Sequence, residues 1–215
     1  MITYSSFNID VYDQIPENKI YILDVGCGTG ALGKALKNQN YNRIVTGFTF
    51  SEEEAKIANL VLDTVIIGNL NHEISDFNTL FDCIIFSHVL EHTYNPLEVL
   101  NNFKRYLAPD GLIIVALPNI LFYKQRLQFM IGNFKYSYHG GLMDITHFRF
   151  FDYDTSFDLI LEAGLIPITR KVSGNFPLGA FRNILKSFSK KIDNTALKYF
   201  PGLFGHQFIM VCKLN

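Results

Sequence analysis

Residues 22–30 read ILDVGCGTG and end the first apolar run of the chain. The run has the aliphatic, β-branched composition of a buried strand, and the residues after it have the spacing of a helix. Gly26, Gly28 and Gly30 alternate through the turn, where glycine lets the backbone bend sharply and a ligand approach closely. A strand, a glycine loop and a helix in this order favour a nucleotide-binding site over an ordinary turn.

Short apolar runs and helical patterns alternate along the rest of the chain, as in a parallel sheet covered on both faces. We expect strands at residues 20–25, 43–50, 65–67, 83–86, 112–117, 165–172 and 207–212, and helices at 31–37, from 51, at 96–107, 122–131 and 155–163. The predicted fold class is α/β: a doubly wound, mostly parallel sheet of seven strands with a helical insertion before the last strand.

Local signals mark the ends of several elements. Ser51 and Glu54 have the spacing of a capping box, in which the serine caps a helix and the glutamate reaches back to it. Asn95 followed by Pro96 is typical of a helix start. Residues 109–111, Pro-Asp-Gly, predict a turn into the fifth strand.

The length of 215 residues and the 48% of apolar residues fit one domain with a sizeable core. Within this domain, 1–215, we distinguish an N-terminal extension at 1–19, a substrate-side helix and loop at 118–154, and the helical insertion at 174–205. The net charge of −1 gives no reason to expect a nucleic-acid partner.

Cys27, Cys83 and Cys212 lie in or beside apolar runs and lack metal-ligand or redox spacing, which indicates reduced, buried thiols. The N-terminal residues lack the order of a signal peptide, and no uncharged apolar run approaches the roughly 18 residues that a bilayer requires. We therefore expect a cytoplasmic protein without a transmembrane segment.

Two nucleotides compete for the glycine loop. Gly28, Gly30 and Gly33 have the spacing of a nicotinamide dinucleotide site. However, Asp24 precedes the loop directly, where a carboxylate would repel a pyrophosphate but suits the ammonium and sulfonium of S-adenosylmethionine. Thr49 stands at the end of the second strand, where a dinucleotide site carries an acid. The residues favour S-adenosylmethionine.

The chain resembles class I S-adenosylmethionine-dependent methyltransferases in several stretches that occur in the same order. After ILDVGCGTG these are FDCIIFSHVLEH (81–92), LAPDGLIIVALPN (107–119), GGLMDITHFRFF (140–151) and EAGL (162–165). The combination is similar to small bacterial enzymes related to quinone O-methyltransferases and to a methionine-biosynthesis methyltransferase-like group, whose members often accompany surface-glycan genes. The resemblance covers about residues 20–168 and the final strand. It implies a Rossmann-like methyltransferase fold whose last strand is antiparallel to the rest.

The resemblance also implies roles for particular residues. The positions that hold the methionine moiety of the cofactor match Asp24, Gly26, Gly28 and Gly30. The positions at the adenine match Asn69 and Leu70, and the position lining the sulfonium matches Ser87. We add Thr49 and Phe50, at the end of the second strand, to the cofactor-binding residues. One departure is that Thr49 replaces the usual acid. A similar Gly-x-Thr-x-Ser run occurs in cyclopropane-forming methyltransferases, where a downstream polar residue also serves the adenosine. Glu54 holds that downstream place here, or is a capping-box acid only.

Methyl transfer to a hydroxyl needs good positioning and a base. His147 is the candidate base, because histidine titrates near neutrality, and Asp144 three residues earlier is expected to orient it. The alternative is that Asp144, His147 and Arg149 tie a lid loop together by hydrogen bonds. Arg149 is available for an anionic group on the acceptor. We also assign His92, Asn119 and Tyr138 to the substrate side.

Two histidine sets were weighed as metal ligands and neither has a specific spacing. They are the sets His139, Asp144 and His147, and His88 with His92. We therefore expect no metal, and a polar patch formed by His88, Glu91 and His92 beside the cofactor.

The late segment 176–204 carries apolar residues at helical spacing beside a locally basic sequence. These apolar residues are Phe176, Leu178, Phe181, Ile184, Leu185 and Phe188. The segment is expected to pack as a cap on the domain or to join two copies in a homodimer, and the alternative is peripheral contact with a membrane that bears a lipid-linked glycan acceptor.

The predicted function is transfer of a methyl group from S-adenosyl-L-methionine, leaving S-adenosyl-L-homocysteine, to an oxygen of a sugar, a glycan intermediate or another small metabolite. The alternatives are a non-catalytic cofactor-binding partner protein and a nicotinamide-dependent oxidoreductase.

Overall fold

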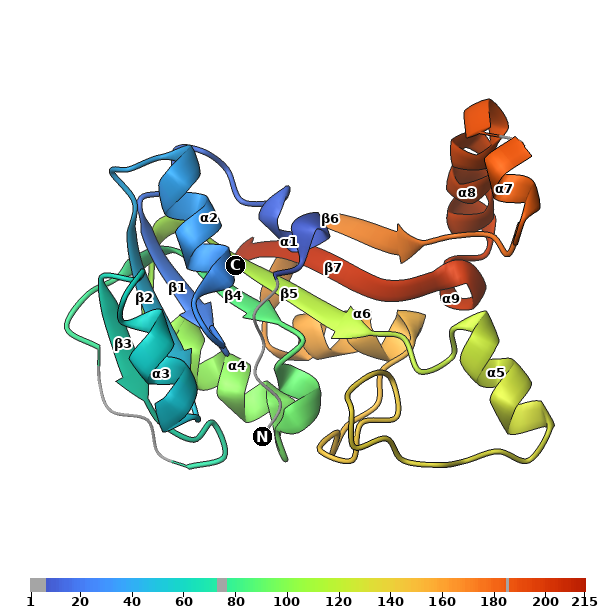
Figure 1. Cartoon of the computed structure of the whole chain (residues 1–215). Helices are drawn as coiled ribbons and strands as arrows, with labels where there is room; N and C mark the ends of the chain where they lie inside the picture. Colours follow the sequence, from blue (N-terminus) through green and yellow to red (C-terminus); the bar gives the residue numbers. More distant parts are fainter. Residues whose placement is uncertain (1–6, 73–76, 185) are drawn as a thin grey trace.

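The computed structural model describes residues 7–72, 77–184 and 186–215 (Figure 1). Seven strands form one sheet in the order β3-β2-β1-β4-β5-β7-β6. Their bounds are β1 Tyr21–Val25, β2 Ile44–Thr49, β3 Thr64–Ile67, β4 Phe81–Ser87, β5 Leu107–Pro118, β6 Leu165–Gly174 and β7 Gly205–Leu214. The pairs from β3 to β5 are parallel, and β7 runs antiparallel to both of its neighbours. The doubly wound sheet with an antiparallel last strand is therefore confirmed.

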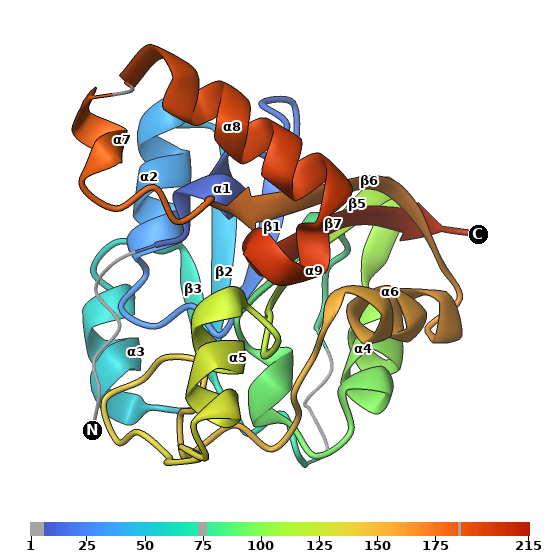
Figure 2. The ribbon, with the colours of Figure 1, turned by 90° about the vertical axis from the view of Figure 1, so that its right-hand side faces the viewer.

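Helices cover both faces of the sheet (Figure 2). Their bounds are α1 Ile9–Tyr12, α2 Ala31–Gln39, α3 Glu52–Ala58, α4 Pro96–Lys104, α5 Tyr123–Met130, α6 Tyr153–Glu162, α7 Phe181–Ile184, α8 Lys186–Tyr199 and α9 Pro201–Phe204, with a 3₁₀ turn, η1, at Leu90–His92. One apolar cluster joins the sheet to α4 and α6, and the other joins it to α1, α2 and α3.

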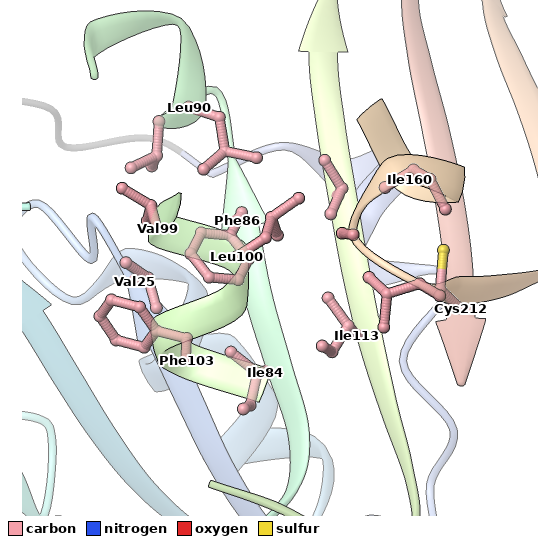
Figure 3. Packing of buried hydrophobic residues seen from close by; sticks show 14 of the residues in the cluster. Val25, Ile84, Phe86, Leu90, Val99, Leu100, Phe103, Ile113, Ile160 and Cys212 are labelled. Atoms are coloured by element: carbon pink, nitrogen blue, oxygen red, sulfur yellow. The ribbon is translucent and has the colours of Figure 1, made fainter. Parts of the chain in front are cut away.

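Alternation along the strands supplies both cores, because successive strand residues point to opposite faces. Ile84 and Phe86 face α4, whereas Cys83 and Ile85 face the cluster that contains α2. On the α4 side the ring of Phe103 meets that of Phe86 edge-on at 5.5 Å between centroids (Figure 3). Cys27, Cys83 and Cys212 are free and buried, as predicted.

The predicted caps at Ser51 and Asn95 are confirmed, but the return bond of the capping box is not formed as expected, because the backbone N–H of Ser51 donates to the Thr49 hydroxyl. Ser51 caps α3 by accepting a hydrogen bond from the backbone N–H of Glu54 at 3.2 Å. Asn95 caps α4, with Pro96 in the first turn. Both caps satisfy backbone donors that a helix leaves unpaired at its first turn.

The fifth strand begins earlier than predicted. β5 starts at Leu107 rather than Leu112, and α4 stops at Lys104. The Pro-Asp-Gly sequence at 109–111 does bend the chain, with Asp110 at φ 60°, but as an irregularity inside the strand. Pairing with β4 shifts there from Phe81 opposite Leu107 to Cys83 opposite Leu112. A bulge therefore replaces the expected turn.

The late segment forms α7, α8 and α9 between the last two strands of the chain. Phe176 and Leu178 are half-buried, but Phe181, Ile184 and Phe188 are exposed, and Leu185 lies outside the described residues. The prediction that this apolar face packs on the domain as a cap is therefore wrong for Phe181, Ile184 and Phe188. Among residues 7–72, 77–184 and 186–215, no helix combines the length and apolar character needed to cross a bilayer.

Candidate functional site

The site lies where the strand order reverses. β1 is paired with β2 on one side and with β4 on the other, so the loops after β1 and β4 leave the sheet side by side. In open α/β sheets, ligands bind at the carboxyl ends of the strands at such a point. The loop after β1 carries the three glycines and opens α2, and the loop after β4 carries η1.

All three loop glycines adopt left-handed backbone conformations, with φ of 78° at Gly26, 52° at Gly28 and 81° at Gly30. Such backbone angles are energetically unfavourable for L-residues that have a side chain. Gly26 has a second constraint, because a Cβ there would lie 2.3 Å from Cγ2 of Val89 in the segment after β4. The glycines thus let the two loops meet closely and leave the backbone bare.

Asp24 is the acidic residue beside this loop. It is the penultimate residue of β1 and is 3% exposed. Burial raises the pKa of Asp24 to about 7. A carboxylate in such a position favours a cationic ligand, which would stabilise its charged form.

The end of β2 joins Thr49 to Glu54. The buried Thr49 hydroxyl donates to Oε2 of Glu54 at 3.0 Å and accepts the backbone N–H of Ser51 at 3.3 Å. A carboxylate therefore stands at the end of β2 after all, although it belongs to the first turn of α3. Phe50 lies between these residues in sequence and is 68% exposed.

The remaining residues assigned to the cofactor lie at the carboxyl ends of β3 and β4. Asn69 follows β3 and accepts the backbone N–H of Asn71 in a tight turn, while Leu70 packs against the core beside α4. Ser87 is the half-buried last residue of β4. All the predicted cofactor residues thus lie at the same edge of the sheet, because they follow parallel strands.

A second cluster combines residues distant in the sequence. Side-chain donor atoms of Glu91, His92 and His147 all lie within 4.8 Å of one another. The two histidine rings meet edge-on at 4.6 Å between centroids. The loop that carries His147 is held here because the Glu91 carbonyl accepts the backbone N–H groups of Phe148 and Arg149.

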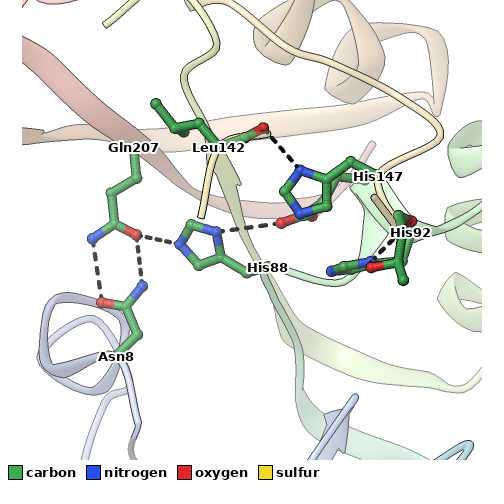
Figure 4. Close-up of polar contacts among 8 residues, drawn as sticks. Asn8, His88, His92, Leu142, His147 and Gln207 are labelled. Atoms are coloured by element: carbon green, nitrogen blue, oxygen red, sulfur yellow. Dashed lines mark hydrogen bonds and ion pairs between the residues drawn. The ribbon is translucent and has the colours of Figure 1, made fainter. Parts of the chain in front are cut away.

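The orientation of His147 differs from the prediction. Its Nδ1 faces the carbonyl oxygen of Leu142 at 3.2 Å (Figure 4), whereas Asp144 accepts hydrogen bonds from the backbone and the hydroxyl of Thr146. The expected orienting bond from Asp144 is therefore wrong. Two residues of separation let the Asp144 carboxylate close a local turn on Thr146, which competes with the longer reach to the imidazole. Burial lowers the pKa of His147 below its ordinary value.

Glu91 was predicted as part of a polar patch with His88 and His92, without a catalytic role. It is 1% exposed, and neither carboxylate oxygen has a hydrogen-bond partner of good geometry among the described residues. Its Oε1 lies 3.3 Å from Nδ1 of His88. A buried carboxylate without full compensation is costly, which marks a functional position.

His88 links this carboxylate to the N-terminal segment. Its Nε2 lies 2.7 Å from Oε1 of Gln207, whose side chain pairs with that of Asn8 (Figure 4). Burial opposes ionisation, but the close contact with the Glu91 carboxylate and its charge raise the pKa of His88 above its ordinary value. His88 also has φ of 56°, a strained backbone for a residue with a side chain.

The cluster of Glu91, His92 and His147 offers two imidazoles and a carboxylate, a donor set that suits a divalent transition metal. This set differs from both histidine sets considered from the sequence, since it joins η1 to the loop at 140–150. The sequence analysis placed Glu91 in a polar patch with His88 and His92 but in neither metal set, and its burial has no signature in the sequence.

The predicted substrate residues have different surroundings. His92 accepts or donates a hydrogen bond with the Thr146 hydroxyl at 2.9 Å, and Tyr138 is exposed on the loop. The Arg149 guanidinium donates twice to the Tyr94 carbonyl. Asn119 is fully buried, and its amide donates to the carbonyls of Gly202 and Gly205 and accepts from Leu121.

These contacts show that Arg149 helps to hold the loop and that Asn119 ties β5 to α9. The burial of Asn119 and its occupied hydrogen-bonding groups argue against the expected contact with a substrate.

The sequence model of a family described as "Methyltransferase domain" matches residues 6–165, which contain the glycine loop, Asp24 and the cluster around Glu91. The chain belongs to this methyltransferase domain family. The matched range ends where β6 begins, so the family match includes both loops at the strand reversal.

Curated relatives of this methyltransferase domain are ubiquinone biosynthesis O-methyltransferases. That of Rickettsia canadensis is 31% identical over 104 residues, covering 47% of this chain and 44% of the relative. That of Haemophilus ducreyi is 31% identical over 122 residues, covering 50% of each. The chain spans about half the length of the curated relatives it matches.

Solved structures share the fold of the methyltransferase domain. A SAM-dependent methyltransferase from Archaeoglobus fulgidus superposes with a TM-score of 0.66 at 17% identity, covering 95% of this chain and 90% of that one. The fold is therefore that of S-adenosylmethionine-dependent methyltransferases, as the resemblance implied.

Proposed function

We propose that this methyltransferase domain binds S-adenosylmethionine and transfers its methyl group to a hydroxyl oxygen of a small acceptor. The observation that carries the proposal is the buried Asp24 carboxylate beside three left-handed glycines at the reversal of the strand order. The carboxylate complements the positive charge of a sulfonium that also bears an ammonium group, and the bare glycine backbone lets such a ligand approach closely. The relatives named as O-methyltransferases support oxygen as the acceptor atom.

We propose which residues would hold each part of the cofactor. Asp24, Gly26, Gly28 and Gly30 would hold the methionine moiety, with Ser87 beside the sulfonium. Glu54, held by the Thr49 hydroxyl at 3.0 Å, would accept hydrogen bonds from the ribose and so replace the usual acid of the second strand. Phe50, Asn69 and Leu70 would surround the adenine.

S-adenosylmethionine, when bound, would supply an activated methyl group for in-line attack by the acceptor oxygen, with the C–S bond broken as the O–C bond forms and S-adenosylhomocysteine as the leaving group. His147 would take the hydroxyl proton of the acceptor as this bond forms. A carbonyl only accepts hydrogen bonds, so the contact of Nδ1 with Leu142 places the imidazole proton on Nδ1 and leaves the lone pair on Nε2. Burial lowers the pKa of His147, which favours the neutral imidazole whose Nε2 lone pair can accept a proton.

Glu91 would stabilise the imidazolium that forms when His147 takes the proton. Its charge raises the pKa of His147 and so opposes the effect of burial. The buried Glu91 carboxylate lies within 4.8 Å of a ring nitrogen of His147, and its charge acts strongly there because little solvent screens it. In this proposal Glu91, rather than Asp144, is the acidic partner of the base.

The acceptor would be a hydroxylated small molecule that stacks on aromatic side chains. Tyr94 and Phe148 pack with 4.5 Å between ring centroids, both are exposed, and Phe148 directly follows His147 in sequence. Such a surface suits a phenolic ring or the apolar face of a sugar. A sugar or glycan intermediate remains our finer hypothesis, and the buried, free cysteines support a reducing, cytoplasmic location.

Calorimetry with S-adenosylmethionine, S-adenosylhomocysteine and NAD tests the assignment. We expect the first two to bind and NAD to bind at least a hundredfold more weakly. Tight NAD binding would overturn the proposal. Incubation with methyl-labelled S-adenosylmethionine and phenolic or sugar acceptors, followed by mass spectrometry, then distinguishes an enzyme from a non-catalytic partner protein, which would bind without transferring label.

A further inference from the structure

The segment formed by α7, α8 and α9 joins β6 to β7 (Figures 1 and 2). Two adjoining surface regions of this segment are lined by side chains of α8. Both regions include Lys191 and Thr195 of α8, so they meet along this helix. One is apolar and the other is basic. This separation along one helix is the pattern of a segment that lies at a boundary between water and an apolar phase.

The apolar region is a groove of about 630 Å³ between α8 and α9. Its aromatic side chains are exposed at the rim: Phe188 by 62%, Tyr199 by 66% and Phe200 by 59%. Exposed aromatic side chains in such number are unfavourable in water. The groove therefore predicts an apolar occupant.

The basic region is an exposed face of α8 that carries Lys190, Lys191 and Lys198 with Asn194 and Thr195. All three lysines are exposed. The acid in the same helix, Asp193, is already paired with Arg182 at 2.7 Å. The three ammonium groups thus form a positive surface that attracts anions.

The charge of this segment contrasts with that of the chain. Residues 170–198 contain seven of its 19 Lys and Arg residues but one of its 20 Asp and Glu residues. Phosphate groups at the surface of an anionic bilayer complement three clustered lysines. Aromatic residues prefer the interfacial region beside those phosphates.

We propose that α7, α8 and α9 dock the protein on the surface of an anionic phospholipid membrane, with Phe188 and Phe200 in the interface and the lysines on the phosphates. A second copy of the chain fits less well. A two-fold contact places the same surface against itself, and three lysines would then face three lysines.

The apolar surface continues onto the substrate side of the domain. The ring of Phe204 in α9 lies 6.2 Å from that of Tyr123 in α5, and Arg126 of α5 donates to the Gly202 carbonyl. Met130 and Ile131, at the end of α5, are both exposed. Docking through α8 would therefore bring α5 toward the same membrane. This inference stands on the surface alone and does not depend on the proposed methyl transfer.

Vesicle flotation with the full chain tests the proposal. We expect binding to vesicles of phosphatidylcholine and phosphatidylglycerol (3:1), at least tenfold weaker binding to phosphatidylcholine alone, and release by added salt. The variant Lys190→Glu/Lys191→Glu/Lys198→Glu should bind at least tenfold more weakly. Its matched control, Lys34→Glu/Lys56→Glu/Lys213→Glu, changes three other exposed lysines and should bind within twofold of the parent.

A second pair of variants tests the aromatic contribution. Phe188→Ser/Phe200→Ser should lose most binding, whereas Tyr41→Ser/Leu60→Ser, which alters exposed residues on other surfaces, should not. Thermal melts verify that all variants fold. The proposal is overturned by absent flotation with anionic vesicles, by equal losses in test and control variants, or by a dimer in light scattering that the Phe188→Ser/Phe200→Ser variant dissociates.

Discussion

Nδ1 of His147 lies 3.2 Å from the carbonyl oxygen of Leu142, and this contact determines which nitrogen of the imidazole carries the proton. The backbone of the loop at 140–150 thus does what a carboxylate does in many histidine sites. The position of the lone pair on Nε2 follows from the fold of this loop, and so does the first prediction.

Replacing His147 with Ala should lower kcat by about 10²- to 10⁴-fold, the usual contribution of a general base. The dissociation constant for S-adenosylmethionine should stay within threefold of the parent, because the glycine loop is untouched. Steady-state kinetics and calorimetry measure the two quantities. Unchanged kcat would assign His147 to holding the loop only.

The pH profile of kcat/KM should show an acid limb, because only unprotonated His147 accepts a proton. Burial lowers the pKa of His147, so this limb should lie below pH 6.5 and activity should be full at neutral pH. In Glu91→Gln the limb should move to lower pH, since the Glu91 charge raises the pKa of His147. A shift to higher pH, or no shift, would remove Glu91 from the proposed pair.

Asp24 should make cofactor affinity depend on pH. Its pKa is about 7 in the free protein, and a cationic ligand favours the ionised form and lowers that pKa. Binding should therefore release a proton around pH 6 and strengthen as pH rises to about 8. Asp24→Asn should bind about 10- to 100-fold more weakly and lose this pH dependence. Calorimetry in buffers of different ionisation enthalpy measures the released proton.

Gly26→Ala should lower the free energy of unfolding by about 2–4 kcal/mol, combining overpacking with a left-handed backbone. The added Cβ would lie 2.3 Å from Val89 Cγ2. In a Val89→Ala background the same change should cost roughly 1–2 kcal/mol, the backbone part alone. Urea denaturation of the parent, the two single variants and the double variant gives the coupling free energy between positions 26 and 89. Equal costs in both backgrounds would show that Val89 does not confine Gly26.

The glycine loop, Asp24 and most strands could be predicted because their signals are local. The nucleotide-binding loop is recognised from neighbouring residues alone, because a strand, alternate glycines and a helix follow one another in the sequence. Apolar runs indicate directly which strands are buried. The parallel order then brings Thr49, Asn69 and Ser87 to one edge. Side chains that follow parallel strands need no further information to meet.

The pair formed by Leu142 and His147 could not be predicted, because a backbone carbonyl acts through geometry and not through residue type. The burial of Glu91 depends on the loop that closes over η1, more than 50 residues later in the chain. The bulge at 109–111 is a similar case, since Pro-Asp-Gly suits a turn and a bulge equally well. In each case the deciding contact joins distant segments.

The side chains of Asn8 and Gln207, 199 residues apart in the sequence, meet beside His88 at the tip of β4. During synthesis, the strand that carries Gln207 leaves the ribosome last of the seven. A nascent chain that already has its glycine loop therefore still lacks the hydrogen-bond partner of His88. The polar half of the site matures only after residue 207 has been synthesised.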